Sequence, residues 1–489
     1  MNRTRIVLLA IPALLAGCSL APIFKQPEVA TPAAWKELPP AERGTWKQAK
    51  PADGESRGQW WKVFNDPVLN GLEEEATTAN QNLKAAAARV AQARALLGVA
   101  KSEQYPKLNA GFGPSRIQQT GVSFGLPEGQ APGGPYTVWR GLLTASYEVD
   151  LFGRIADGVS ASRSDLESRE ALFAAAILTL QADVAQTYFA LRQSDEQLQV
   201  LRDTVKLREE AVRLLQRRYD LGAIGEFDLV RARTDLSLAQ NDLYALERQR
   251  AQLEHGLAVL LGKAPASFSL AVAPLTTDLP SIPAGLPSTL LERRPDIAAA
   301  QRTMAASNAR IGVAKAAFFP VLNITALGGY ESYELGDLFK WSSRTWALGP
   351  LAGTILSMPL FDGGRNQANL DRSYAVLEES VAQYRQTVLS AFADVEDNLA
   401  ALRTLSNQAV ATRDSVVAAT RAFKIADSRY KNGAALYLEV IEAQRTLLLS
   451  QLLENRVKGE RATSTVAFIR ALGGGWDEPE AAPAAVPAK

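Results

Sequence analysis

The sequence predicts an α+β membrane protein built from two internal structural repeats, each of which supplies membrane strands and long helices outside the membrane. Three observations predict this fold. The second half of the chain repeats the first at a separation of about 211 residues. Each half also contains segments that alternate between apolar and polar side chains, and each contains one very long helical segment.

The repeat covers most of the chain, and its landmarks follow one order in both halves. A period of about 200 residues is too long for a solenoid and indicates duplication of a half-molecule. The recurring landmarks are GVAK at 98–101 and 312–315, LFGR at 151–154 and LFDGGR at 360–365, ADV at 182–184 and 393–395, the Arg-Tyr-x-x-Gly-Ala elements at 218–223 and 429–434, and LG at 261–262 and 472–473.

Composition excludes several functional classes. The chain has 489 residues and a formal net charge of +1, so nothing in its charge favours a nucleic-acid partner. A single Cys and a single His exclude a disulfide framework and an ordinary His/Cys metal site. We therefore expect no cofactor and no metal, and the scarcity of catalytic groups argues against an enzyme.

The N-terminus predicts a signal peptide over residues 1–17. Arg3 and Arg5 precede a short apolar stretch, and Leu15–Cys18 resembles the bacterial lipobox, in which cleavage precedes a lipid-modified Cys. Cys18 is thus the candidate lipidation site, and we expect the protein to be a lipoprotein that carries palmitate there. Ser19, the next residue, is typical of lipoproteins sorted to the outer membrane. The alternative is an ordinary secretory signal. No later apolar run is long enough for a membrane helix, so strands must do any crossing.

The strand signals lie at corresponding places in the two repeats. From Thr137 to Leu151, apolar residues on one face alternate with polar residues on the other, and only Leu142 breaks the pattern. Trp139 and Tyr147 lie roughly 26 Å apart on the apolar face at about 3.3 Å per residue, which matches the aromatic girdles of membrane barrels. Further strands are predicted at 108–115, 322–330 and, with Pro350 indicating an edge or bulge, 346–360. The alternative for each is a soluble half-buried sheet.

The helical signals are equally paired. No Gly or Pro interrupts Asn366 to Asn432, and its apolar residues recur close to the 3.5-residue heptad spacing of a coiled coil. At 1.5 Å per residue such a helix reaches roughly 100 Å. In the matching run of the first repeat, Arg154 to Leu221, Gly158 is the only Gly or Pro residue. Shorter helices are predicted at 76–105, 226–261, 294–318 and 438–472.

Four strands cannot close a membrane barrel, because small barrels start near eight strands and an open edge leaves backbone groups unpaired in lipid. We therefore expect oligomerisation. The whole pattern resembles the TolC-like outer-membrane factors, in particular the lipoprotein branch that serves resistance-nodulation-division drug-efflux pumps. The most specific elements are the lipobox at Cys18, the strand-to-helix turn at 359–365 and the two Tyr-x-x-Gly elements.

The resemblance implies a homotrimer whose twelve-stranded transmembrane β-barrel continues into an α-helical coiled-coil tunnel through the periplasm. It implies a lipid-anchored, membrane-spanning protein of the Gram-negative outer membrane. The implied division is a signal peptide at 1–17, a lipidated arm with an equatorial segment at 18–75, repeats at 76–262 and 294–473 around a linker at 263–293, and a Pro/Ala-rich tail at 474–489. We expect residues 22 to about 75 to form an extended arm.

The resemblance also implies a periplasmic aperture, closed by tyrosines and carboxylates that select cations. We expect the tyrosines to donate hydrogen bonds to the carboxylates and Arg231 to supply a countercharge. Ala435 stands where some members carry an arginine, so the resemblance leaves the exact closing network open. The alternative for the two glutamates, spaced i, i+3, is a solvated helix face. The corresponding aperture residues are Tyr219, Asp228, Arg231, Tyr430, Glu439 and Glu442.

These features predict a passive outer-membrane exit duct of a tripartite efflux system, with a periplasmic adaptor and an inner-membrane pump as partners. An outer-membrane component of a type I protein-secretion or metal-efflux system is the alternative. A periplasmic adaptor itself would carry one helical hairpin and a β-rich remainder. An enzyme would need a base, and His255 lies in a helical stretch without a visible partner.

Overall fold

The computed structural model describes residues 19–29, 32, 34–37, 58–118, 134–275, 279–280, 293–349 and 356–474. It divides into two compact units, which we call the sheet unit and the hairpin unit. The sheet unit comprises Met1–Pro27, Val90–Arg169 and Ala300–Tyr384, and the hairpin unit comprises Glu28–Arg89, Glu170–Ala299 and Arg385–Lys489. Cys18 and the C-terminal tail from residue 475 lie outside the described residues.

Six of the described α-helices occur in pairs of equal length, one from each repeat. The pairs are α3 (Gln81–Ser102) with α7 (Pro295–Ala316), both of 22 residues, α4 (Arg154–Asp220) with α8 (Arg365–Lys431), both of 67, and α5 (Glu226–Leu260) with α9 (Tyr437–Ala471), both of 35. Equal lengths confirm the predicted duplication, and the two long helices begin and end within one residue of the predicted bounds. Within the described residues, no helix combines the length and the apolarity needed to cross a membrane.

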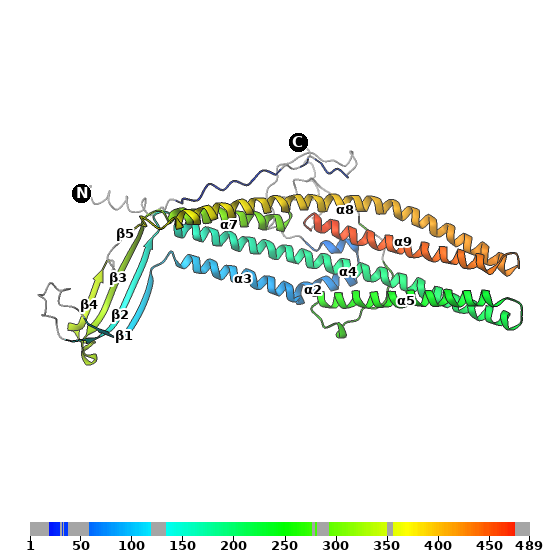
Figure 1. The fold of residues 1–489 in the computed structure, drawn as a ribbon, viewed down its shortest axis with the longest axis horizontal. Coiled ribbons are helices and arrows are strands. Elements are labelled where there is room, and N and C mark those ends of the chain that lie inside the picture. The colour runs from blue at the N-terminus through cyan, green and yellow to red at the C-terminus, as the bar shows by residue number, and fades with distance from the viewer. Residues whose placement is uncertain are drawn as a thin grey trace, which may run out of the picture. The chain divides into compact units, whose positions relative to one another are not determined.

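The sheet unit contains an antiparallel sheet in the order β1–β2–β3–β4, with β5 also pairing with β3 (Figure 1). Its strands are β1 (Lys107–Ile117), β2 (Tyr136–Val149), β3 (Val321–Ser332), β4 (Arg344–Leu348) and β5 (Leu356–Ser357). The predicted strand at 346–360 is thus shortened to β4 and β5, and Pro350 lies among residues 350–355, outside the described chain.

The register places the predicted apolar positions of all the long strands on one face. Ala145 of β2 pairs with Leu108 of β1 and with Ala326 of β3, and Ala326 pairs with Leu348 of β4. Opposite residues in antiparallel strands share a face, so the alternation found in each strand becomes one apolar surface. Its large side chains include Leu108, Phe112, Trp139, Leu143, Tyr147, Leu322, Ile324, Tyr330, Trp346 and Leu348.

The register also explains Leu142, the one residue that breaks the alternation of β2. Leu142 lies opposite Gly111 on one side and Gly329 on the other, so a large side chain stands between two residues that have none. A Cβ at Gly329 would collide with the backbone carbonyl oxygen of Gly141. Glycine is therefore required at this close approach of β2 and β3.

The expectation of an extended arm up to about residue 75 is wrong from Trp60 onward. Trp60–Phe64 forms the 3-10 helix η2, and α2 spans Pro67–Ala79, so helical structure crosses the predicted boundary at residue 76. Trp60, Trp61 and Phe64 are buried in the largest apolar cluster of the hairpin unit, together with residues of α4, α5 and α9. Burial of these aromatic rings, which local composition does not reveal, fixes the segment as helix.

Within the hairpin unit, a buried ion network holds the described first part of the inter-repeat linker against α4 and α5. Asp195 of α4 is fully buried and pairs with Arg192 and with Arg250 of α5. Arg192 donates to the Ala271 carbonyl at 2.6 Å, and the Asp195 carboxylate accepts from the backbone N–H of Ala273 at 3.2 Å. The charges of this network therefore satisfy main-chain groups that no secondary structure pairs.

Candidate functional site

The candidate site lies in the hairpin unit, where each long helix turns back into a 35-residue helix. In the first turn, Gly222 has a φ of 69° and Ala223 donates its N–H to the Arg218 carbonyl at 2.8 Å. In the second, Gly433 has a φ of 73° and Ala434 donates to Arg429 at 2.8 Å. This is the Schellman arrangement, which requires a left-handed residue, and it explains why glycine recurs in both Arg-Tyr-x-x-Gly elements.

Near the turns, two polar contacts join the first hairpin, α4–α5, to the second, α8–α9. Arg218 donates through Nη1 to the Tyr430 hydroxyl at 2.8 Å, and its guanidinium lies 5.2 Å from the centre of the Tyr430 ring. Arg231 of α5 donates through Nη2 to Glu442 of α9 at 3.0 Å. Both contacts are partly exposed, so each stabilises the association of the hairpins only modestly.

Tyr437, the first residue of α9, adds an apolar contact between the hairpins. It packs against the cluster of Leu215, Leu229 and Ala232 from α4 and α5, and its ring centre lies 5.1 Å from that of Tyr430. Burial, reinforced by the neighbouring Tyr430, raises the pKa of Tyr437 to about 12. Tyr437 is therefore neutral at physiological pH and acts by packing.

The predicted aperture residues are brought to this end of the hairpins, but they are not joined as expected. Tyr430 contacts Arg218 and not a carboxylate. Glu439 pairs with Arg429 at 3.0 Å within its own hairpin, and Glu442 pairs with Arg231, the predicted countercharge. In the described part of the chain, Tyr219 and Asp228 make no side-chain hydrogen bond or ion pair.

Sequence reasoning missed Arg218, Arg429 and Tyr437. The signal for the two arginines was present, because each directly precedes the tyrosine of the repeated element. Their roles nevertheless differ: Arg218 reaches the second hairpin, whereas Arg429 stays on its own. The repeat therefore identified the positions but not their partners.

Large apolar side chains are exposed around the same turns. Leu221 is 83 % exposed, and Phe227 and Leu436 are each 72 % exposed. Leu221 and Phe227 flank the first turn, and Leu436 directly precedes α9. Exposed apolar side chains that gather at the end of a helical hairpin are typical of a protein–protein contact.

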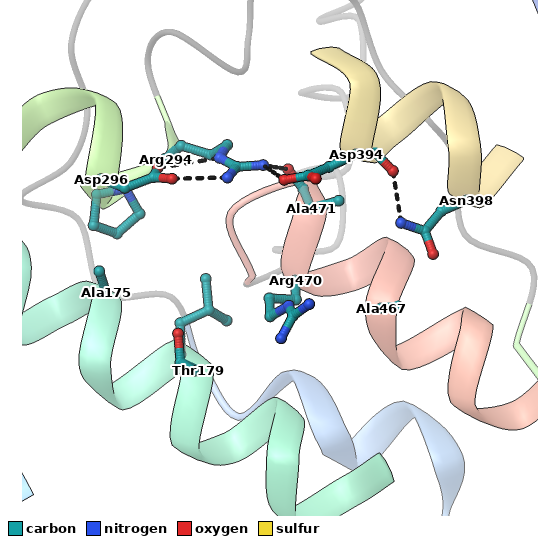
Figure 2. A pocket seen from close by; sticks show the side chains of 11 residues that line it. Ala175, Thr179, Arg294, Asp296, Asp394, Asn398, Ala467, Arg470 and Ala471 are labelled. Atoms are coloured by element: carbon teal, nitrogen blue, oxygen red, sulfur yellow. Dashed lines mark hydrogen bonds and ion pairs between the residues drawn. The ribbon is translucent and has the colours of Figure 1, made fainter. Parts of the chain in front are cut away.

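A second polar cluster closes the other end of the second hairpin (Figure 2). Arg294, directly before α7, pairs with Asp296 at 2.7 Å and with Asp394 of α8 at 2.9 Å, and it donates to the Ala471 carbonyl at the end of α9 at 3.2 Å. Arg470 and Asn398 border the adjoining pocket of about 290 Å³. Arg294 thus ties three helices together.

The described residues contain no group of three or more His, Cys, Asp or Glu side chains that could hold a metal ion. What the chain presents is a sheet with one apolar face, paired helical hairpins, and charged and aromatic contacts at the hairpin ends.

Sequences of known outer membrane efflux proteins match this chain along nearly its whole length. The sequence profile described as outer membrane efflux protein matches residues 72–263 and 286–474. The toluene efflux pump outer membrane protein TtgF of Pseudomonas putida is 33 % identical over 484 residues, covering 97 % of this chain and 98 % of that protein. The outer membrane protein OprJ of Pseudomonas aeruginosa is 32 % identical over 472 residues, covering 96 % and 95 %.

Solved structures of outer membrane channels have the same fold as this chain. The outer membrane channel CmeC of Campylobacter jejuni matches with a TM-score of 0.85 at 28 % identity, covering 95 % of this chain and 96 % of CmeC. The outer membrane protein VceC of Vibrio cholerae matches with a TM-score of 0.77 at 28 % identity, covering 88 % and 100 %. The predicted fold class is confirmed by these matches.

Proposed function

The chain belongs to the outer membrane efflux protein family, and on that premise we propose how it works as the outer-membrane exit duct of a tripartite efflux pump. The protein lies in the Gram-negative outer membrane and conducts substrates outward, with its helices in the periplasm. Members of this family are channels and not enzymes. The observation that carries the function is the match of both repeats to the efflux family. Energy then comes from an inner-membrane transporter of the resistance-nodulation-division class.

The sheet supports a trimeric duct. Among the described strands, β1 pairs only with β2 and β4 only with β3, so both edges have unpaired backbone groups. Edges in contact with lipid must be paired, and three copies would join four strands each into a closed barrel. The exposed side chains of the apolar face, including Leu108, Phe112 and Trp346, would then contact lipid.

The hairpin contacts support a periplasmic gate. Arg218–Tyr430 and Arg231–Glu442 would hold the second hairpin against the first in the closed state. Opening would separate the hairpins and break both contacts. Asp228, Glu439 and Glu442, repeated in three copies, would concentrate negative charge at the narrow end and favour cations.

The apolar side chains at the turns support docking of a periplasmic adaptor. Leu221, Phe227 and Leu436 would be covered by that partner, which in turn joins the inner-membrane transporter. Lipid attached to Cys18 would anchor the arm to the membrane, in addition to the barrel.

Export by cells that lack efflux systems of their own, and that receive the chain with or without its partners, tests this function. Cells that express the chain together with its adaptor and transporter should export a fluorescent substrate, whereas cells that express the chain without the transporter should not. Phe227→Asp together with Leu436→Asp should abolish export while the outer-membrane trimer persists. A matched control is Leu335→Asp, an exposed apolar position in the sheet unit. Export without a transporter would contradict the proposal.

A further inference from the structure

The apolar face of the sheet carries charge at one end only. Among the described strand residues of this face, two are charged, Arg116 of β1 and Arg344 of β4, and both are exposed. Arg116 lies opposite Thr137, and Arg344 lies opposite Tyr330. The remaining charged residues of the described strands lie on the opposite face and are Lys107, Arg140, Glu148 and Glu331. The apolar face is therefore interrupted by positive charge alone.

Both arginines lie toward the end of the sheet at which loops join the strands. Arg116 is the last residue but one of β1, and Arg344 is the first residue of β4. The helices are joined to the other end, because β1 follows α3, β2 precedes α4 and β3 follows α7. Since the helices lie in the periplasm, the loop end faces the exterior of the cell. A charge that faces lipid is costly at the bilayer midplane but is tolerated near its surface, so the two arginines mark the level of the outer headgroups.

The side chain of Arg344 reaches toward the loop between β3 and β4. Its Nε donates to the Trp341 carbonyl oxygen at 3.1 Å, and its guanidinium lies over the Trp341 ring. Trp341 begins the 3-10 helix η6 (Trp341–Ser343), directly before β4, so the charge is carried away from the apolar part of the face. Neither carboxylate of this loop, Glu334 or Asp337, pairs with Arg344. The guanidinium therefore keeps free N–H donors.

The same loop places an aromatic ring on the apolar face. The ring centre of Phe339 lies 5.7 Å from that of Tyr330. A Cβ at Gly141 would lie 4.0 Å from Cε1 of Phe339, and Gly141 is the residue opposite Tyr330 on this face. Leu338, the preceding residue, is fully buried and fixes the loop in place. Phe339 is thus held against the outer part of the apolar face.

The rings around Arg344 are exposed although they are large and apolar. Phe339 is 71 % exposed, Trp341 75 % and Trp346, two residues along β4, 79 %. Lys340 lies between the first two rings and pairs with Asp337 at 2.5 Å, so Arg344 carries the unbalanced charge of this cluster. Exposed aromatic rings beside a cation are typical of the level at which acyl chains meet headgroups.

We propose that this end of the apolar face is a binding site for a phosphorylated glycolipid of the outer leaflet. The guanidinium of Arg344 binds the phosphate, and the acyl chains lie along Phe339 and Trp346. Arg116 offers a second phosphate contact at the β1 edge. Arginine suits this role because its planar fork donates two hydrogen bonds to phosphate oxygens at once. The inference rests on the proposed barrel, in which the apolar face meets lipid.

Charge and position together select this occupant. Both charges on the described strands of the face are positive, so an anionic group complements them, and both lie at the outer surface of the membrane. The rings beside Arg344 continue the apolar surface toward the midplane, which suits a ligand that combines an anionic head with apolar chains. A second copy of the chain would bring the same positive charge to the contact and is disfavoured.

Native mass spectrometry of the protein in non-ionic detergent, titrated with lipid A, measures this binding. Arg344→Gln should weaken binding about tenfold, because it removes charged hydrogen bonds to phosphate. With dephosphorylated lipid A, the native protein and Arg344→Gln should bind alike. Phe339→Ala should weaken both forms of the lipid to the same extent, since its contact is with acyl chains.

The matched control is Arg140→Gln, which removes a cation at nearly the same level of the sheet but on the opposite face, where Arg140 pairs with Glu331 at 3.0 Å. It should leave the affinity for lipid A unchanged. Equal affinities of the native protein and Arg344→Gln for lipid A, or an equal loss with Arg140→Gln, would overturn the lipid site.

The measured masses separate this inference from the barrel on which it rests. Monomers alone would contradict the trimeric barrel, whereas trimers that bind no lipid A would overturn the lipid site and leave the barrel standing. Trimers that associate with one another in place of lipid, and lose that association with Phe339→Ala, would assign the face to a second copy and likewise overturn the proposal.

Discussion

Asn80 and Arg294 occupy equivalent positions in the two repeats and make the same contact with different chemistry. Each directly precedes a 22-residue helix, α3 or α7, and each donates to the last carbonyl of a 35-residue helix. Asn80 Nδ2 reaches the Leu260 carbonyl at 2.8 Å, and Arg294 Nη1 reaches the Ala471 carbonyl at 3.2 Å. The contact closes each repeat on itself, because it joins segments about 180 residues apart.

This contact predicts matched losses of stability in the two repeats. Asn80 Oδ1 also caps α3 by accepting from Leu83, so Asn80→Ala should cost about 1 to 2 kcal/mol. Arg294→Ala removes charged hydrogen bonds and should cost about 2 to 3 kcal/mol. Guanidinium-induced unfolding of the detergent-solubilised protein measures both. Gln81→Ala, at the exposed neighbour of Asn80, should have little effect, and an equal effect there would contradict a specific latch.

The sheet register predicts a contrast between adjacent residues of β2. Leu143→Arg places a charge on the apolar face and should cost roughly 2 to 4 kcal/mol near the bilayer midplane, whereas Thr144→Arg, on the opposite face, should be tolerated. Folding into vesicles, followed by urea titration, gives the two free energies. Similar losses for both substitutions would refute the assignment of the lipid-facing side.

The contact between Arg218 and Tyr430 predicts that the Tyr430 hydroxyl holds the hairpins together. Tyr430→Phe removes the acceptor for a charged donor and should raise the open population about tenfold, in line with a loss near 1.4 kcal/mol. A larger open population should let solutes leak through the channel. Combining Tyr430→Phe with Arg231→Gln should increase this leak further. The readout is uptake of a large antibiotic by cells lacking the transporter. Tyr219→Phe is the matched control, and the same leak from that variant would exclude a specific role for Tyr430.

The glutamates of α9 predict the ion selectivity of the narrow end. Replacing both Glu439 and Glu442 by Lys should reverse or abolish cation preference in planar bilayers. The preference of the native protein should weaken at 1 M salt, where the screening length falls to about 3 Å. Glu460→Lys reverses one charge of α9 away from the turn and serves as control. An unchanged reversal potential in the double variant would place these glutamates outside the conducting path.

Glu73 predicts a pH dependence of stability. Its carboxylate is fully buried without a hydrogen-bond partner in the described chain, and burial raises its pKa from 4.5 to about 9. The native state therefore keeps a proton that the unfolded state releases. The contribution of Glu73 to stability should be fully present below pH 4.5 and should be lost as the pH rises to about 9, by at most about 1.4 kcal/mol per pH unit.

Substitution isolates this effect. Glu73→Gln should remove the Glu73 contribution to the slope and should be more stable than the native protein at pH 8, while the two converge near pH 4.5. Unfolding midpoints at several pH values supply the comparison. Glu74→Gln, at the exposed neighbouring position, should keep the native profile. Parallel pH profiles for the native protein and Glu73→Gln would show that Glu73 does not titrate as described.

Much of the architecture is determined by local patterns in the sequence. The period of two in β2, the heptad spacing of α8 and the recurrence of Arg-Tyr-x-x-Gly each concern neighbouring residues. Such patterns decide which backbone conformation buries apolar side chains, so β1, β2, β3 and the two long helices were predicted close to their observed bounds, whereas the predicted strand at 346–360 was not. The duplication then supplied each element a second time.

Contacts between distant segments were decided only by the tertiary structure. The predicted helix at 76–105 is instead α2 and α3, broken at Asn80, because the Asn80 side chain caps α3 and binds a carbonyl far along the chain. Likewise, Tyr430 pairs with Arg218 of the other hairpin and not with a carboxylate. A residue type states which hydrogen bonds a side chain can form, but the choice among available partners depends on which helices pack together.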